Sequence, residues 1–151
     1  RAREVYPENL DIIRQFIAAH PELEFFEVGG TVLADIVPNL ARMPLPAVVR
    51  EMATCSLHLG IISGPYHIAN ALGVRTIVII NFPHPGSFML PCMKNVDVVE
   101  SEWLYPQSHI LHQDEDSPHW PKFNLKTLEM AYHGETYPYE DPTPFLQLVD
   151  K

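Results

Sequence analysis

The stretch that decides the fold is LGIISGPYHIANALGVRTIVIINF, residues 59–82. It opens with a short apolar run, and a proline follows at a place that suits the first turn of a helix, where its missing N–H removes no hydrogen bond. Ser63 or Gly64 would be the N-cap of that helix, and Gly73 favours its end. Thr76–Ile80 is a continuous β-branched run, which is typical of a parallel strand buried on both faces. The stretch therefore predicts a strand, a glycine turn, a short helix and a second strand.

The residues before this stretch alternate between helical and extended patterns. Four segments are predicted from the spacing of their apolar residues, and they are helix Pro7–Ala19, strand Leu23–Val28, helix Leu45–Ala53 and strand Leu57–Ile62. Thr31–Arg42 is ambiguous, with Ile36-Val37 as a candidate short strand. The alternation predicts an α/β fold, a Rossmann-like parallel sheet with flanking helices.

The second half of the chain has a different composition. Nine of the fifteen prolines lie between Pro83 and Pro144. A further strand is predicted at Val96–Val99, and a helix at Asn124–His133 with Asn124 as its N-cap. We expect residues 1–100 to form a Rossmann-like core and residues 101–151 to form a proline-rich extension that wraps over the same domain.

The charge and the apolar pattern exclude several classes of function. The net charge is −9 and the pI is near 5.2, which argues against nucleic-acid binding through a broad basic surface. A nucleotide ligand stays possible, because it needs only one local positive pole. No apolar run reaches the roughly 18 residues that span a bilayer, and no signal peptide is visible. These features predict a cytoplasmic protein without a transmembrane segment.

The cysteines and the start of the chain give two further expectations. Cys55 and Cys92 have no CxxC spacing, so free thiols in a reducing compartment are expected and a structural zinc site is not. The chain begins at Arg1, close to a helix signal, and we expect it to be a domain of a longer protein.

The turn after the strand at residues 57–62 is the first candidate site. Ligands of open α/β sheets bind beyond the carboxyl ends of strands, at helix N-termini. Gly64 would let an anion approach the backbone, Ser63 offers a hydroxyl donor, Pro65 starts the helix, and His67 lies in its first turn. The alternatives are that the turn is only a helix cap and that His67 is structural.

Other polar groups and glycines are expected at the same edge of the sheet. Gly29 and Gly30 follow a predicted strand and permit either close approach to a ligand or merely a tight turn. Asn81 and His84 follow the strand at residues 76–80, and they are candidates for contacts to a bound ligand or ordinary loop residues. A metal site is not predicted, because the spacing matches no known site type among His109, His112, Asp114, Glu115, Asp116 and His119.

Three consecutive segments resemble one family. They are Ala47–Ala53 (AVVREMA), Leu57–Ile62 (LHLGII) and Ser63–Val74 (SGPYHIANALGV). This arrangement resembles the carboxyl-terminal domain of the bacterial heptosyltransferases, family nine of the glycosyltransferases. Their pattern is a helix, a strand that ends in Asp, and then Ser/Thr-Gly-Pro-x-His-x-Ala-x-Ala-x-Gly. The resemblance covers about Pro7 to Pro91.

The resemblance implies a GT-B fold, in which two Rossmann-like domains face each other and the second holds the nucleotide-sugar donor. It also implies a place in lipopolysaccharide biosynthesis, a nucleoside-diphosphate sugar as substrate, and no cofactor or metal. In that family the amino-terminal domain carries the acceptor site and the catalytic base. By resemblance, this chain alone binds the donor without transferring sugar, it contributes no catalytic residue, and its partner is the missing amino-terminal domain.

One departure from the family pattern leaves alternatives open. The acidic residue of the family before Ser/Thr-Gly falls on Ile62 here, which puts the sugar specificity or the activity itself in question. The first alternative is a degenerate, non-catalytic GT-B-like domain with an assembly or regulatory role. The second is a GT-B epimerase, for which the sequence lacks the acidic residues that the cleft would need.

Overall fold

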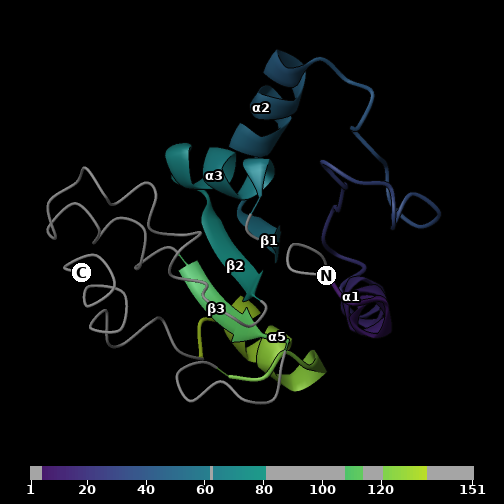
Figure 1. Cartoon of the computed structure of the whole chain (residues 1–151), viewed down its shortest axis with the longest axis vertical. Helices are drawn as coiled ribbons and strands as arrows, with labels where there is room; N and C mark the ends of the chain where they lie inside the picture. The colour runs from purple at the N-terminus through teal and green to yellow at the C-terminus, as the bar shows by residue number, and fades with distance from the viewer. Residues whose placement is uncertain (1–4, 62, 81–107, 114–120, 136–151) are drawn as a thin grey trace, which may run out of the picture.

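The computed structural model describes residues 5–61, 63–80, 108–113 and 121–135, which form one sheet with helices on both faces (Figure 1). The described elements are α1 (Pro7–Ala19), α2 (Leu45–Ala53), β1 (Leu57–Ile61), α3 (Gly64–Ala71), β2 (Arg75–Ile80), β3 (Ser108–His112) and α5 (Leu125–Tyr132). No helix in these ranges combines the length and the apolar character needed to cross a membrane.

The three strands form one parallel sheet in the order β1-β2-β3. In the register of the sheet, Leu59 of β1 pairs with Ile77 of β2, and Ile77 pairs with His109 of β3. The central strand β2 is buried on both faces, because Ile77 and Val78 are each 0% exposed although they point to opposite faces. The α/β class, with a parallel sheet and flanking helices, is confirmed.

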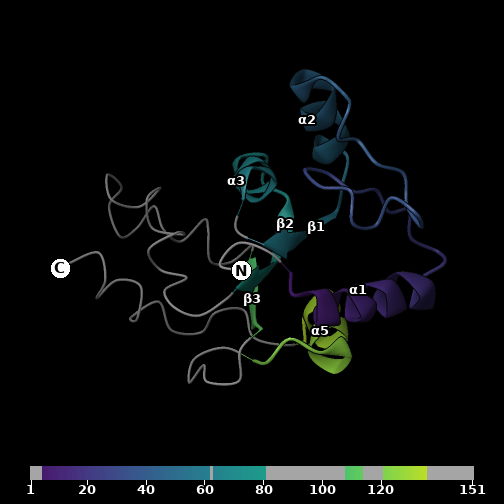
Figure 2. The same cartoon turned by 45° about the vertical axis from the view of Figure 1, so that its right-hand side comes forward.

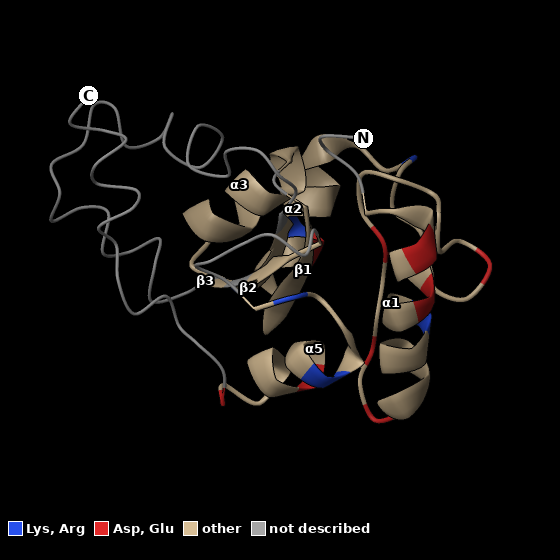
Figure 3. Cartoon of the chain, turned by 60° about the horizontal axis from the view of Figure 1, so that its bottom comes forward, with Lys and Arg blue, Asp and Glu red and all other residues tan. Residues whose placement is uncertain are grey.

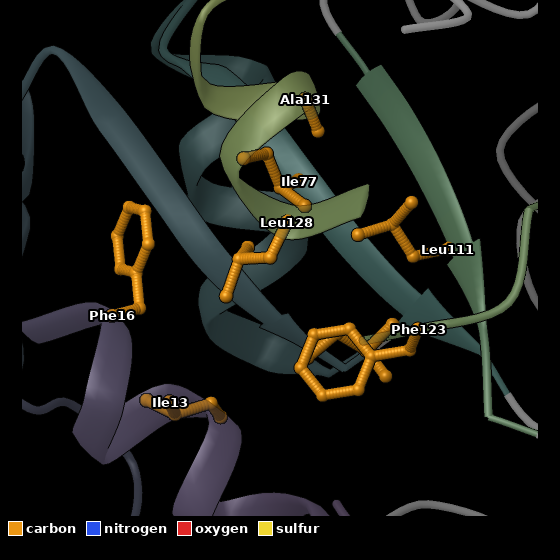
Figure 4. Packing of buried hydrophobic residues seen from close by; sticks show 8 residues of the cluster. Ile13, Phe16, Ile77, Leu111, Phe123, Leu128 and Ala131 are labelled. Atoms are coloured by element: carbon orange, nitrogen blue, oxygen red, sulfur yellow. The ribbon is translucent and has the colours of Figure 1, made fainter. Parts of the chain in front are cut away.

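Helices α1 and α5 pack against each other on one face of the sheet (Figure 2). Each presents apolar side chains three residues apart, which places them on one side of a helix. Together with the sheet these side chains form the main core, and its buried members are Ile13, Phe16, Ile77, Ile79, Leu111, Phe123, Leu128 and Ala131 (Figure 4). Full burial of one large apolar side chain contributes about 1.5–3 kcal/mol, so this face carries much of the stability.

Helix α3 lies on the opposite face, α2 packs against α3, and a smaller apolar cluster lies there (Figures 1 and 2). Its buried members are Met52 of α2, Ala69 of α3 and Val74, which precedes β2. The predicted helices at Pro7–Ala19 and Leu45–Ala53 are both confirmed with the same bounds.

Both ends of α5 are closed by polar groups. Asn124 is the N-cap, since its side chain accepts from the N–H of Thr127 at 2.9 Å and its own N–H donates to Oγ1 of Thr127 at 3.0 Å. At the other end, Nη1 of Arg75 donates to the carbonyl of Tyr132 at 2.9 Å, and Nη2 donates to the carbonyl of Ala131. The cation therefore meets the negative end of the helix dipole. The predicted helix and its cap are confirmed.

The strand β3 is a structural element that the sequence did not predict. Ser108–His112 reads SHILH, a short segment between prolines, and it forms a strand because β2 offers it a parallel ladder. Thus β3 and α5, both within residues 101–151, belong to the sheet and to its main core. The predicted strand at Val96–Val99 lies outside the described residues.

The predicted strand at Leu23–Val28 is wrong. The backbone of Glu27 forms a single parallel bridge, in which its N–H donates to the carbonyl of Pro38 and its carbonyl accepts from the N–H of Leu40. The ladder cannot extend, because Pro38 has no N–H to donate and the chain turns at Gly29, where φ is 80°. The candidate strand at Ile36-Val37 is also wrong, since the N–H groups of both residues bond within a turn to the carbonyl of Leu33.

Candidate functional site

The helix α3 begins directly beyond the carboxyl end of β1, as the sequence predicts. Ser63 is the N-cap residue, with an extended backbone (φ −158°, ψ −179°), and its carbonyl accepts the first helical bond from the N–H of His67 at 3.1 Å. Its hydroxyl does not cap the helix but donates to the carbonyl of Ile61 at 3.3 Å. The first turn of α3 is therefore not closed by the side chain of its own N-cap.

Among the described residues, none fills the space beside Gly64 in the first turn. Gly64 is exposed, and a Cβ atom added to it would meet no atom of the described chain within 4 Å. The α3 segment carries no Asp, Glu, Lys or Arg, whereas α1 carries the two acidic residues Glu8 and Asp11 (Figure 3). The N-terminus of a helix bears about half a positive charge and directs N–H groups outward. Here that pole has no acidic side chain of its own helix beside it.

The structure brings Gly29 to this same place. A Cβ atom added to Gly29 would lie 3.2 Å from Cγ of Pro65, and the positive φ of 80° favours glycine independently of that contact. Two segments that the sequence singled out separately, the glycine pair and the Ser-Gly-Pro turn, are therefore in contact. Gly30 follows, half-buried, with its carbonyl accepting from Nδ2 of Asn39.

A carboxylate holds the glycine loop in position. Glu27 accepts from the N–H of Leu33 at 3.1 Å and from Nδ2 of Asn39 at 2.8 Å, and the same amide bonds Gly30. Sequence reasoning missed both Glu27 and Asn39 as positioning residues. The only signal was an acidic residue two positions before a glycine pair, and the distant asparagine gave none.

Helix α1 anchors the outer part of the same loop. Nη1 of Arg14 donates to Oδ2 of Asp35 at 2.8 Å, and Nη2 donates to the carbonyl of Val32 at 3.1 Å. The hydrogen bond from Arg14 lowers the pKa of the Asp35 carboxyl below its usual value. The pair is exposed, so it contributes little to stability, but it fixes where the loop lies relative to α1.

His67 lies on the exposed side of α3, in its first turn. Its ring meets the edge of the buried Tyr66 ring, with centroids 5.3 Å apart. His67 is therefore not packed in the core, and it belongs to the first turn of α3. Asn81 and His84, the other candidates of this edge, lie outside the described residues.

A polar layer lies beneath α3. Asn70 is 3% exposed, its Nδ2 donates to the carbonyl of Tyr66 at 3.0 Å, and its Oδ1 has no hydrogen-bond partner in the described chain. Nε2 of His58 on β1 is also buried without such a partner, and burial lowers the pKa of His58 to about 4. His58 is thus neutral at neutral pH.

The described residues contain no group of three or more His, Cys, Asp or Glu side chains that could hold a metal ion. His109 and His112 are buried on β3, at 7% and 2% exposure. The remaining candidates of that cluster, residues 114–116 and 119, lie outside the described part. Cys55 is a half-buried free thiol, and burial raises its pKa.

No protein-family model matches the chain, and neither the curated proteins nor the solved structures contain a match. The resemblance to the heptosyltransferases therefore rests only on the sequence segments at residues 47–74, and the candidate site rests only on the geometry described above.

Proposed function

We propose that this chain is the donor-binding domain of a GT-B glycosyltransferase similar to the heptosyltransferases, and that it holds a nucleoside-diphosphate sugar at the N-terminus of α3. One observation carries the proposal: within the described residues, the first turn of α3 is left open at Gly64, it is not capped by Ser63, and the Gly29 loop lies against Pro65. A helix start with these properties is a suitable anion site.

The charges of the molecule support a phosphate ligand at this place. The whole chain carries a net charge of −9, so a phosphate is repelled from most of the surface. The start of α3 offers a local positive pole made of backbone dipoles, and the absence of a Cβ at Gly64 lets a pyrophosphate approach them. A phosphate would therefore bind at the start of α3 rather than elsewhere on the negatively charged surface.

The chemistry of sugar transfer assigns a role to each side chain of the turn. A nucleoside diphosphate leaves with developing negative charge, and a preorganised set of donors stabilises that charge. Backbone N–H groups of the first turn would supply most of these hydrogen-bond donors. The Ser63 hydroxyl would turn from the carbonyl of Ile61 to the phosphate, and the ring of His67 would contact a phosphate or sugar oxygen. An amino-terminal domain would supply the acceptor and the base.

Calorimetric titration of the full chain with ADP, UDP and their sugars, ADP-heptose included, tests the proposal. The Gly64→Asp variant should weaken binding at least about tenfold, because a carboxylate would stand where the phosphate binds. Gln15→Glu adds the same charge on the exposed side of α1 and is the matched control, which should bind like the original chain. Folded protein that releases no heat with any of these ligands would favour the non-catalytic alternative and sink the proposal.

A further inference from the structure

A histidine bridges two acidic side chains at the end of α1. His20 follows the last residue of α1 and is 8% exposed. Its Nδ1 lies 2.9 Å from Oε1 of Glu22, and its Nε2 lies 2.8 Å and 2.9 Å from the two carboxylate oxygens of Glu129 on α5. One imidazole ring therefore joins the end of α1 to the middle of α5.

Aromatic rings close the remaining sides of this imidazole. The ring of Phe16 lies 4.6 Å from it and the ring of Tyr132 lies 4.8 Å from it, between centroids. Besides Tyr132, His133 is a titratable group nearby, with its ring 6.4 Å away and its Nε2 3.6 Å from Oε2 of Glu129. From β2, Arg75 is engaged with the last carbonyls of α5. The groups that set the charge of His20 are therefore the two carboxylates.

The geometry requires a protonated ring. Imidazolium donates from both nitrogens, but a neutral imidazole carries one N–H and one lone pair. In the neutral form, one nitrogen would direct its lone pair at a carboxylate oxygen less than 3 Å away, which is repulsive. Deprotonation of His20 must therefore break its contact with either Glu22 or Glu129.

We propose that His20 is a pH-sensitive latch that holds α1 to α5 while it is protonated and loosens the end of α1 when it loses its proton. The opposite end of α1 is fixed independently, because Oε1 of Gln113 accepts from the N–H of Tyr6 at 2.8 Å and from Nδ2 of Asn9 at 3.0 Å. Opening is thus confined to the His20 end of the α1–α5 layer.

The direction of the switch follows from the neighbours. Burial lowers the pKa of His20, but the hydrogen bonds to Glu22 and Glu129 outweigh it, so the pKa is raised above its ordinary value of about 6.5. A group with a raised pKa stabilises the folded state fully below the unfolded pKa, and that stability is lost as the pH rises through the folded pKa. The latch is therefore closed below the ordinary histidine pKa of about 6.5 and opens as the pH rises through the raised pKa of His20.

Nuclear magnetic resonance of the labelled full chain tests the latch. The ring signals of His20, assigned by their loss in His20→Gln, should titrate above about pH 6.5. Amide hydrogen exchange at the end of α1 and in α5, corrected for the intrinsic pH dependence, should accelerate about tenfold above that titration, while β2 stays unchanged. A ring that titrates at or below about pH 6.5, or exchange that does not follow its titration, overturns the proposal.

Two carboxamide variants separate the latch from general charge effects. Glu129→Gln should bring the pKa of His20 back toward the ordinary value and abolish the pH dependence of exchange. Glu24→Gln removes the same charge from an exposed position two residues after Glu22, and it should leave both unchanged. Equal effects of the two variants would mean that the bridge to Glu129 has no special role.

Discussion

The two eight-residue helices of this domain start from almost the same backbone and use their first turns in different ways. The N-cap of α5, Asn124, has φ −154° and accepts from Thr127, whereas the N-cap of α3, Ser63, has φ −158° and bonds back to Ile61 instead. Both residue types are good caps. A cap residue alone therefore does not show whether a helix start is closed by its own side chain or open to a ligand.

The residues that follow the cap explain the difference. In α5 the third helical residue is Thr127, which returns a hydrogen bond to the N-cap and closes the capping box. In α3 the second helical residue is Pro65, which has no N–H, and the third is Tyr66, whose buried side chain is part of the inner face of the helix. The α3 start therefore cannot form the same reciprocal closure.

Truncation of the α5 core should have the largest effect on stability. Leu128→Ala removes a side chain that is 0% exposed in the main core, and the free energy of unfolding should fall by about 2–5 kcal/mol. The matched control is Leu72→Ala at the end of α3, where the side chain is 38% exposed and little change is expected. Urea denaturation measures both, and similar losses would contradict the assignment of α5 as the structural helix.

Acid should destabilise the α3 side of the sheet through His58. Its pKa is lowered by burial to about 4. Between pH 6.5 and 4, His58 is therefore protonated in the unfolded chain but stays neutral in the folded chain. Stability should therefore fall with decreasing pH over this window, by on the order of 3 kcal/mol. His58→Gln should flatten that slope in denaturation curves, and an unchanged slope would exclude His58 as its cause. His20 acts with the opposite sign, since its contribution is lost as the pH rises.

The contact between the glycine loop and α3 can be measured with matched glycines. In Gly29→Ala the residue would keep a positive φ, and its new Cβ would lie 3.2 Å from Cγ of Pro65. The free energy of unfolding, measured by urea denaturation, should fall by about 1–2 kcal/mol. Gly134 has a similar φ of 70°, and a Cβ added there meets no atom of the described residues within 4 Å, so Gly134→Ala measures the backbone cost alone. The additional loss of stability in Gly29→Ala measures the contact with Pro65. Equal losses in the two variants would show that this contact does not restrict the added Cβ.

Substitution of the two N-cap residues should have the smallest effect on stability, and it tests directly whether the starts of α3 and α5 differ. Asn124→Ala should destabilise the domain by about 1 kcal/mol, because the N–H of Thr127 loses its acceptor. Ser63→Ala should change stability by less than about 0.5 kcal/mol, since its hydroxyl satisfies no N–H of α3. Thermal denaturation of the two variants side by side decides the point, and equal losses would make Ser63 an ordinary cap.

The parts of the fold with strong local signals could be predicted. The helices at Pro7–Ala19 and Leu45–Ala53 have apolar residues at helical spacing, the strand at Thr76–Ile80 is continuously β-branched, and Asn124 caps its helix through residues close in sequence. The prediction failed at Leu23–Val28, where the segment is apolar but its pairing ends at a proline in another loop.

The candidate site was predicted in part. The sequence marked the Ser63–Pro65 turn and Gly29 as separate candidates, because glycine and proline impose local backbone geometry. It gave no sign that Gly29 would pack on Pro65, or that Glu27 and Asn39 would hold the loop there. Those contacts join residues far apart along the chain, and their pairing has no periodicity to read.

The α/β class, the central buried strand and a helix that begins next to Pro65 could be predicted from the residues alone, because hydrophobic periodicity and the stereochemistry of glycine and proline act over a few neighbouring residues. Only the tertiary structure decided that β3 joins the sheet, that His20 bridges Glu22 to Glu129, and that the α3 start stays open beside Gly29. The physical reason is that hydrogen bonds and contacts between distant segments depend on where the packed core places them.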